Sequence, residues 1–171
     1  MGWKTVKETY GIEHIVHVRN GDILIGSPYI SNIVTISPDG EIKKRYSGGN
    51  EDLTRVQSEM DADPAKLLEA VRAKDIFSVS NTVYTYNGGE ILEKQCESYG
   101  WPNITHDGCL MYENTFSPDR REIILTAKRE AAFGIKSYRR MIKEKEQELQ
   151  KLHSGLAQEF ANLKQLRMLT E

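Results

Sequence analysis

The chain has 171 residues, of which 39% are hydrophobic and 28% are charged. This composition is ordinary for a globular protein and excludes a chain that is disordered throughout. The length exceeds that of a typical single domain without requiring two full cores. We therefore expect one compact domain with an appendage.

Signals for secretion and for membrane insertion are both missing from the sequence. No apolar h-region follows Met1, and no run of about 18 consecutive apolar residues occurs. Two cysteines, Cys96 and Cys109, are too few for a disulfide framework in a chain of this size. We expect a cytoplasmic protein with reduced thiols and without membrane contact.

The net charge of −2 is unevenly distributed along the chain. Residues 1–117 hold 11 Lys and Arg against 17 Asp and Glu, whereas residues 118–171 hold 12 against 8. The division coincides with a change in pattern from strand-like to helical. We predict an α+β protein, with a β-hairpin-rich body over residues 1–117 and a helical arm over residues 118–171.

Two β-hairpins are predicted in the first 46 residues. Asn20-Gly21 separates the alternating segment 13–19 from the apolar run 22–25. This dipeptide favours a two-residue turn, because both central residues need positive φ. Strand patterns at 32–36 and 41–46 flank the turn sequence Ser37-Pro38-Asp39-Gly40, which predicts the second hairpin.

One short helix and further strands are predicted in the rest of the body. The polar residues 47–52 indicate a loop, and Asp63-Pro64 then begins a helix that runs to about residue 74. Strand patterns follow at the end of this helix and on either side of the turn Asn87-Gly88-Gly89. Their ranges are 76–79, 82–86 and 90–94. Residues 98–108 are irregular.

A single long helix is predicted for the arm. Ser117-Pro118-Asp119 is typical of a helix start, with Ser117 as N-cap and Pro118 at the first helical position. No proline follows before Leu169. Gly155 costs about 1 kcal/mol in a helix interior relative to alanine, but the apolar repeat keeps its register across it. We expect one continuous helix rather than a helical hairpin.

The arm carries an apolar repeat that is typical of a coiled coil. Apolar residues recur every seven positions, and further ones lie three residues after members of that series. We define this set as the seam and predict that it forms an oligomer interface; it comprises Ile135, Tyr138, Ile142, Leu149, Leu152, Leu156, Leu163 and Leu166. The other two positions of the repeat, Lys145 and Glu159, are charged.

The best candidates for a metal site or a catalytic thiol are Cys96, His106, Asp107 and Cys109. Cys and His are zinc ligands, and His106-x-x-Cys109 has a compatible spacing, but the pattern lacks a Cys-x-x-Cys pair. The other interpretation is a loop histidine with two small buried thiols. We assign no catalytic residue, no metal ligand and no cofactor.

Two surfaces are candidates for partner binding. In the arm, Arg129, Lys136, Arg140 and Lys143 form a basic stripe on the face away from Ile135 and Ile142, suited to phosphates or to an acidic protein. In the body, Tyr99 and Trp101 flank a glycine in a loop, and exposed aromatics can anchor an interface. A solvated helix face and a loop packed onto the body are the alternatives.

These patterns favour a non-enzymatic binding or regulatory protein, in the manner of a small viral or bacterial accessory inhibitor. It would form a homodimer or higher oligomer and occupy another macromolecule, most simply a protein. The alternatives are a small metal- or thiol-dependent enzyme and a nucleic-acid binder that uses the basic stripe.

Overall fold

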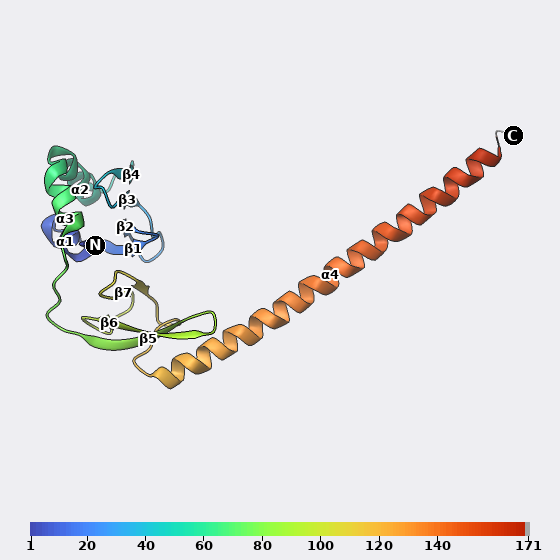
Figure 1. Ribbon diagram of the computed structural model, residues 1–171. Coiled ribbons are helices and arrows are strands. Elements are labelled where there is room, and N and C mark those ends of the chain that lie inside the picture. The colour runs from blue at the N-terminus through green and yellow to red at the C-terminus, as the bar shows by residue number, and fades with distance from the viewer. Residues whose placement is uncertain (170–171) are drawn as a thin grey trace. The chain divides into compact units, whose positions relative to one another are not determined.

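The computed structural model describes residues 1–169, and residues 170 and 171 of the predicted arm lie outside this range. The chain divides into two compact units, Met1–Thr126 and Ala127–Glu171. The first unit is an antiparallel β-body with short helices, which ends in the start of the long helix α4, Arg120–Met168 (Figure 1). The predicted α+β class with a long C-terminal helix is confirmed.

A four-stranded antiparallel sheet forms in the order β1-β2-β3-β4. Its strands are β1 (Ile15–Arg19), β2 (Asp22–Gly26), β3 (Val34–Ile36) and β4 (Ile42–Lys44). Both predicted hairpins are confirmed. Asn20 and Gly21 turn the first with φ of 53° and 82°, and Gly40 closes the second with φ of 77°, as a left-handed turn residue requires.

The body contains three helices where the sequence predicted one. The predicted helix is α3 (Pro64–Arg72), capped by the Asp63 carboxylate, which accepts a hydrogen bond from the Lys66 amide at 2.9 Å. The additional helices are α1 (Trp3–Thr9) and α2 (Glu51–Ala62). The prediction of a polar loop over residues 47–52 is therefore wrong at its end, where α2 begins.

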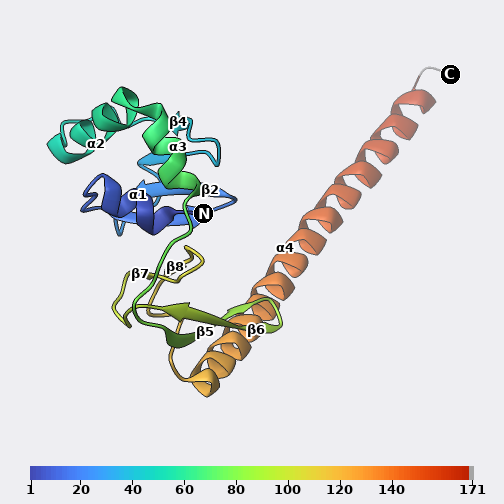
Figure 2. The ribbon, with the colours of Figure 1, turned by 60° about the vertical axis from the view of Figure 1, so that its left-hand side comes forward.

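The main core lies between the four-stranded sheet and these three helices, which Figure 2 shows gathered beside the sheet. Every one of these elements except β4 contributes fully buried side chains. A buried aliphatic side chain contributes about 1.5–3 kcal/mol to the free energy of unfolding. The core comprises Trp3, Val6, Tyr10, Ile12, Val16, Ile23, Ile25, Val34, Ile36, Leu53, Val56, Met60, Leu67, Ala70, Val71 and Ile104.

Two short antiparallel pairs complete the body. β5 (Asn81–Asn87) and β6 (Glu90–Cys96) form the hairpin predicted around Asn87-Gly88-Gly89, and β7 (Asn103–Ile104) pairs with β8 (Leu110–Met111). A second, smaller core joins them and is made of Val83, Cys96, Met111 and Phe116.

The predicted strand at residues 76–79 is wrong, because this segment has no regular structure. Its backbone and side chains contact other parts of the body individually. The carbonyl of Ile76 accepts a hydrogen bond from Lys4 Nζ at 3.0 Å, and the Ser78 amide donates to Glu97 at 3.1 Å. Ile76 is 83% exposed, so the apolar run that suggested a strand does not mark a buried one.

Helix α1 connects the two cores through the loop around His106. The indole of Trp3 donates a hydrogen bond to the His106 carbonyl at 3.1 Å, and the ring of Phe77 stacks on the His106 ring with centroids 3.8 Å apart. Beside them, the amide of Val18 in β1 donates to the Gly108 carbonyl at 2.7 Å. Gly108 therefore lies in close contact with β1.

The close contact between Gly108 and Val18 predicts a larger loss of stability for Gly108→Ala than for Gly88→Ala. Both glycines have positive φ, 83° and 55°, but a Cβ at Gly108 would lie 2.3 Å from Cγ2 of Val18, whereas a Cβ at Gly88 meets nothing within 4 Å. We expect losses of about 2–4 kcal/mol for Gly108→Ala and about 1–2 kcal/mol for Gly88→Ala in urea unfolding. Equal losses would contradict the proposed packing.

Candidate functional site

The long helix is fixed to the body at its first turn. Ser117 pairs with Tyr84 of β5 through two backbone hydrogen bonds of 2.8 and 3.0 Å. The helix α4 begins at Arg120 and not at Pro118, so the predicted start of this helix is wrong by two residues. Ser117 Oγ accepts from the Asp119 amide, and Asp119 in turn accepts from the Arg121 amide at 2.8 Å.

From Arg120 to Met168 the helix is continuous. It passes through Gly155 without interruption, so the prediction of one long helix rather than a hairpin is confirmed. At a rise of 1.5 Å per residue, its 49 residues span about 74 Å. Among the described residues of α4, only Ile123 in the second turn is buried.

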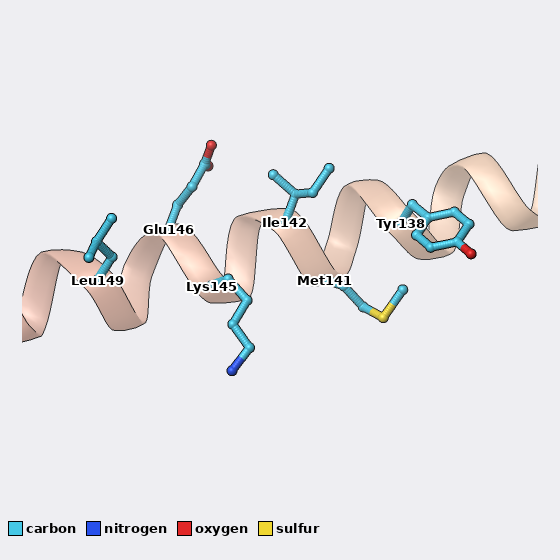
Figure 3. A pocket seen from close by; sticks show the side chains of 6 residues that line it. All are labelled: Tyr138, Met141, Ile142, Lys145, Glu146 and Leu149. Atoms are coloured by element: carbon cyan, nitrogen blue, oxygen red, sulfur yellow. The ribbon is translucent and has the colours of Figure 1, made fainter.

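All eight residues of the seam lie on α4 with exposed side chains. Their exposed fractions range from 45% for Leu163 to 67% for Tyr138. Near the middle of the helix lies an open, shallow apolar surface, bordered by Tyr138, Met141, Ile142, Lys145, Glu146 and Leu149. In Figure 3, Ile142, Glu146 and Leu149 project to one side and Met141 and Lys145 to the other. The apolar repeat is thus exposed along the arm.

The basic stripe is also exposed on α4. Its charges are partly compensated within the helix, because Arg140 Nε lies 3.8 Å from the Glu144 carboxylate four residues later. Such exposed pairs contribute about 0.3–0.5 kcal/mol and are screened by salt. The stripe is accessible to a partner, but a neighbouring carboxylate partly neutralises its positive charge.

The aromatic loop of the body borders an open hollow. Trp101 is 36% exposed and Tyr99 is 47% exposed, so neither is fully packed onto the body. Trp101 lines the hollow, while Tyr99 is not among its lining residues. The wall comprises Pro28, Trp101, Pro102, Tyr112, Glu113 and Asn114. Sequence reasoning missed the contributions from residue 28 and residues 112–114, because no local pattern brings these segments together.

Cys96, His106, Asp107 and Cys109 lie in separate environments within the body. Cys96 is fully buried, with its thiol 3.6 Å from the Asn81 carbonyl, and the His106 ring stacks on Phe77. Within residues 1–169, no three His, Cys, Asp or Glu side chains are placed to hold a metal ion together. The metal alternative therefore has no assembled ligand set in the described part of the chain.

The electrostatic setting disfavours reactive thiolates. Burial raises the pKa of Cys96, and burial together with the negative charge of Asp107 raises the pKa of Cys109. Burial also acts to raise the pKa of Asp107, but hydrogen bonds from Lys94 and Thr105 outweigh it and hold that pKa below its usual value. Asp107 is accordingly an ionised partner of Lys94. A nucleophilic cysteine needs a lowered pKa, which neither thiol has.

Comparison with protein-family models, curated proteins and solved structures finds no match to this chain. None of the helices within residues 1–169 combines the length and the apolar content that crossing a membrane requires. The functional conclusion therefore depends on the surfaces described above.

The environments of the two thiols predict different rates of modification. At pH 8 we expect Cys109 to react with an aromatic disulfide reagent more slowly than a free thiol, because its raised pKa lowers the thiolate fraction. Cys96 should react only after unfolding, and denatured protein should titrate two thiols. Rapid reaction of Cys96 in folded protein, or stoichiometric zinc in the purified protein, would favour the metal- or thiol-dependent enzyme instead.

Proposed function

We propose that this chain is a non-enzymatic binding or regulatory protein, which self-associates through α4 and acts by occupying another macromolecule. The observation that carries the proposal is the exposed seam, which continues in register from Ile135 to Leu166. Exposed apolar patches of this extent mark interaction sites on soluble proteins. A repeat of 3.5 residues suits a partner that is itself a helix.

The energetic argument for a partner is direct. Burying each Leu or Ile of the seam would contribute about 1.5–3 kcal/mol, whereas leaving it in water contributes nothing to folding or binding. An amphipathic helix in a globular protein is stabilised mainly by tertiary packing of its apolar face. Another copy of the arm offers a surface with the same repeat and the same length.

The body supplies a separate surface for the occupied partner. Trp101 and Tyr112 are the aromatic types that dominate binding energy at protein interfaces, and the neighbouring Glu113 offers a charge at the rim. This hollow lies in the unit Met1–Thr126, while the seam lies in the unit Ala127–Glu171. Self-association and partner binding can therefore use different surfaces. The free thiols support action in a reducing compartment such as the cytoplasm.

Charge in the seam is expected to dissociate the oligomer. In Leu149→Glu/Leu156→Glu, each substitution removes about 1.5–3 kcal/mol of burial and places a carboxylate in an apolar interface. Light scattering should report a multiple of 19.5 kDa for the wild type and a smaller mass for the variant. The matched control is Gln150→Glu/Ala157→Glu, which introduces the same charges at the same spacing one position outside the seam, and should remain associated. A monomeric wild type would refute self-association.

The basic stripe is tested by replacing Arg129, Lys136, Arg140 and Lys143 with glutamine. If the stripe contacts the partner, the variant should keep its oligomeric mass and bind a co-purified partner more weakly, with a smaller difference at high salt. A steep linear dependence of log affinity on log salt would identify the partner as nucleic acid. Unchanged affinity in the four-residue variant would assign the stripe to a solvated helix face.

A further inference from the structure

Two charged residues interrupt the seam at corresponding positions. Lys145 lies three residues after Ile142, and Glu159 lies three residues after Leu156, at positions where the repeat otherwise has Tyr138, Leu152 and Leu166. Both side chains are exposed on α4. An interface that buries the seam must therefore accommodate one positive and one negative charge from each copy.

Lys145 has an oppositely charged neighbour on its own helix, whereas Glu159 has none three or four residues away. Lys145 Nζ lies 2.7 Å from the Glu148 carboxylate on the next turn. Glu159 has Gly155, Leu156, Asn162 and Leu163 at the positions three and four residues away, none of which is basic. Glu159 therefore needs a cation from another helix when the seam is covered.

A parallel, in-register pair of arms does not provide that cation. In this arrangement each seam residue faces its own counterpart, so Lys145 meets Lys145 and Glu159 meets Glu159. Lys145 and Glu159 are 14 residues apart, or about 21 Å along the helix, too far to compensate each other. Like charges placed opposite each other in an interface are strongly unfavourable.

An antiparallel pair of arms brings Lys145 of each copy near Glu159 of the other copy. Full overlap of the two seams places Ile135 opposite Leu166, Ile142 opposite Glu159, and Lys145 opposite Leu156 of the second copy. Lys145 of one chain and Glu159 of the other then occupy neighbouring layers, three residues or about 4.5 Å apart along the axis. The flexible lysine stem can span this step while its methylenes cover apolar surface. Twofold symmetry creates the pair twice.

We propose that the occupant of the seam is a second copy of this chain bound antiparallel, with Lys145 of each arm paired to Glu159 of the other. This inference rests on the proposed function, because it specifies the geometry of the same self-association. The seam spans 32 residues from Ile135 to Leu166, so the body-proximal ends of the two seams are separated by about 47 Å. The bodies are attached at opposite ends, which makes the dimer a bivalent binder with two separated partner surfaces.

A charge-swap cycle tests the orientation. The dimer dissociation constants of the wild type, Lys145→Glu, Glu159→Lys and the double variant are measured by analytical ultracentrifugation. In the antiparallel dimer each single swap places like charges side by side, so we expect at least about tenfold weaker association. The double variant recreates both pairs with reversed sign. It should return to within about threefold of the wild type, a coupling that independent sites do not show.

Controls separate this pairing from effects on the helix itself. Lys151→Glu makes the same charge change on the outer face and should leave association unchanged, and circular dichroism of each variant checks helix content. Four similar dissociation constants, or a double variant as weak as the two singles combined, would overturn the antiparallel pairing while leaving self-association intact. A monomeric wild type would overturn the proposed function together with this inference.

Discussion

The need to cover the apolar seam of α4 is the constraint on which the proposed function depends. Beyond its second turn, the described part of this helix has no buried side chain, yet it places Leu, Ile and Tyr side chains at a regular 3.5-residue interval. Apolar side chains at scattered surface positions need no explanation. A repeat that keeps its register over 32 residues does need an explanation. Burial of each apolar side chain is favourable, and one partner surface could cover all of them.

The body differs from the arm, because it buries two clusters of apolar side chains within the chain. Trp3, Phe77 and the His106 loop join a four-stranded sheet to a second, smaller core. Trp101 and Tyr112 line an open hollow on this body. In the proposed function, the body is the partner-binding module and the arm is its connector.

The sequence predicts those elements whose signals are local. Asn20-Gly21, Gly40 and Asn87-Gly88-Gly89 each specify a turn through the backbone geometry that they permit, and Asp63-Pro64 specifies a helix start. Helix α2 was missed because the Ser-Gly-Gly stretch before Asn50 suggested a loop. The spacing of Leu53, Val56 and Met60, with acidic residues in the first turn, could have identified it.

Features that depend on contacts between distant segments could not be predicted in this way. Residues 76–79 resemble a strand, but no neighbouring strand pairs with them, and Lys4 and Glu97 take their hydrogen bonds instead. The aromatic hollow combines residue 28, residues 101–102 and residues 112–114, so only Trp101 was anticipated, and Tyr99 lies outside the lining. The eight seam residues, by contrast, were chosen from helical periodicity alone. They are exposed on α4, and their role as an interface stays a prediction.

Hydrogen exchange along α4 at several protein concentrations tests the central claim most directly. If a second copy covers the seam, amides between residues 135 and 166 should be protected at high concentration and lose protection on dilution, because opening the helix then requires dissociation. Amides of the body core should be unaffected by dilution and serve as the internal reference. Rapid exchange of the arm at every concentration, or protection that does not change on dilution through the dissociation range, would contradict the account.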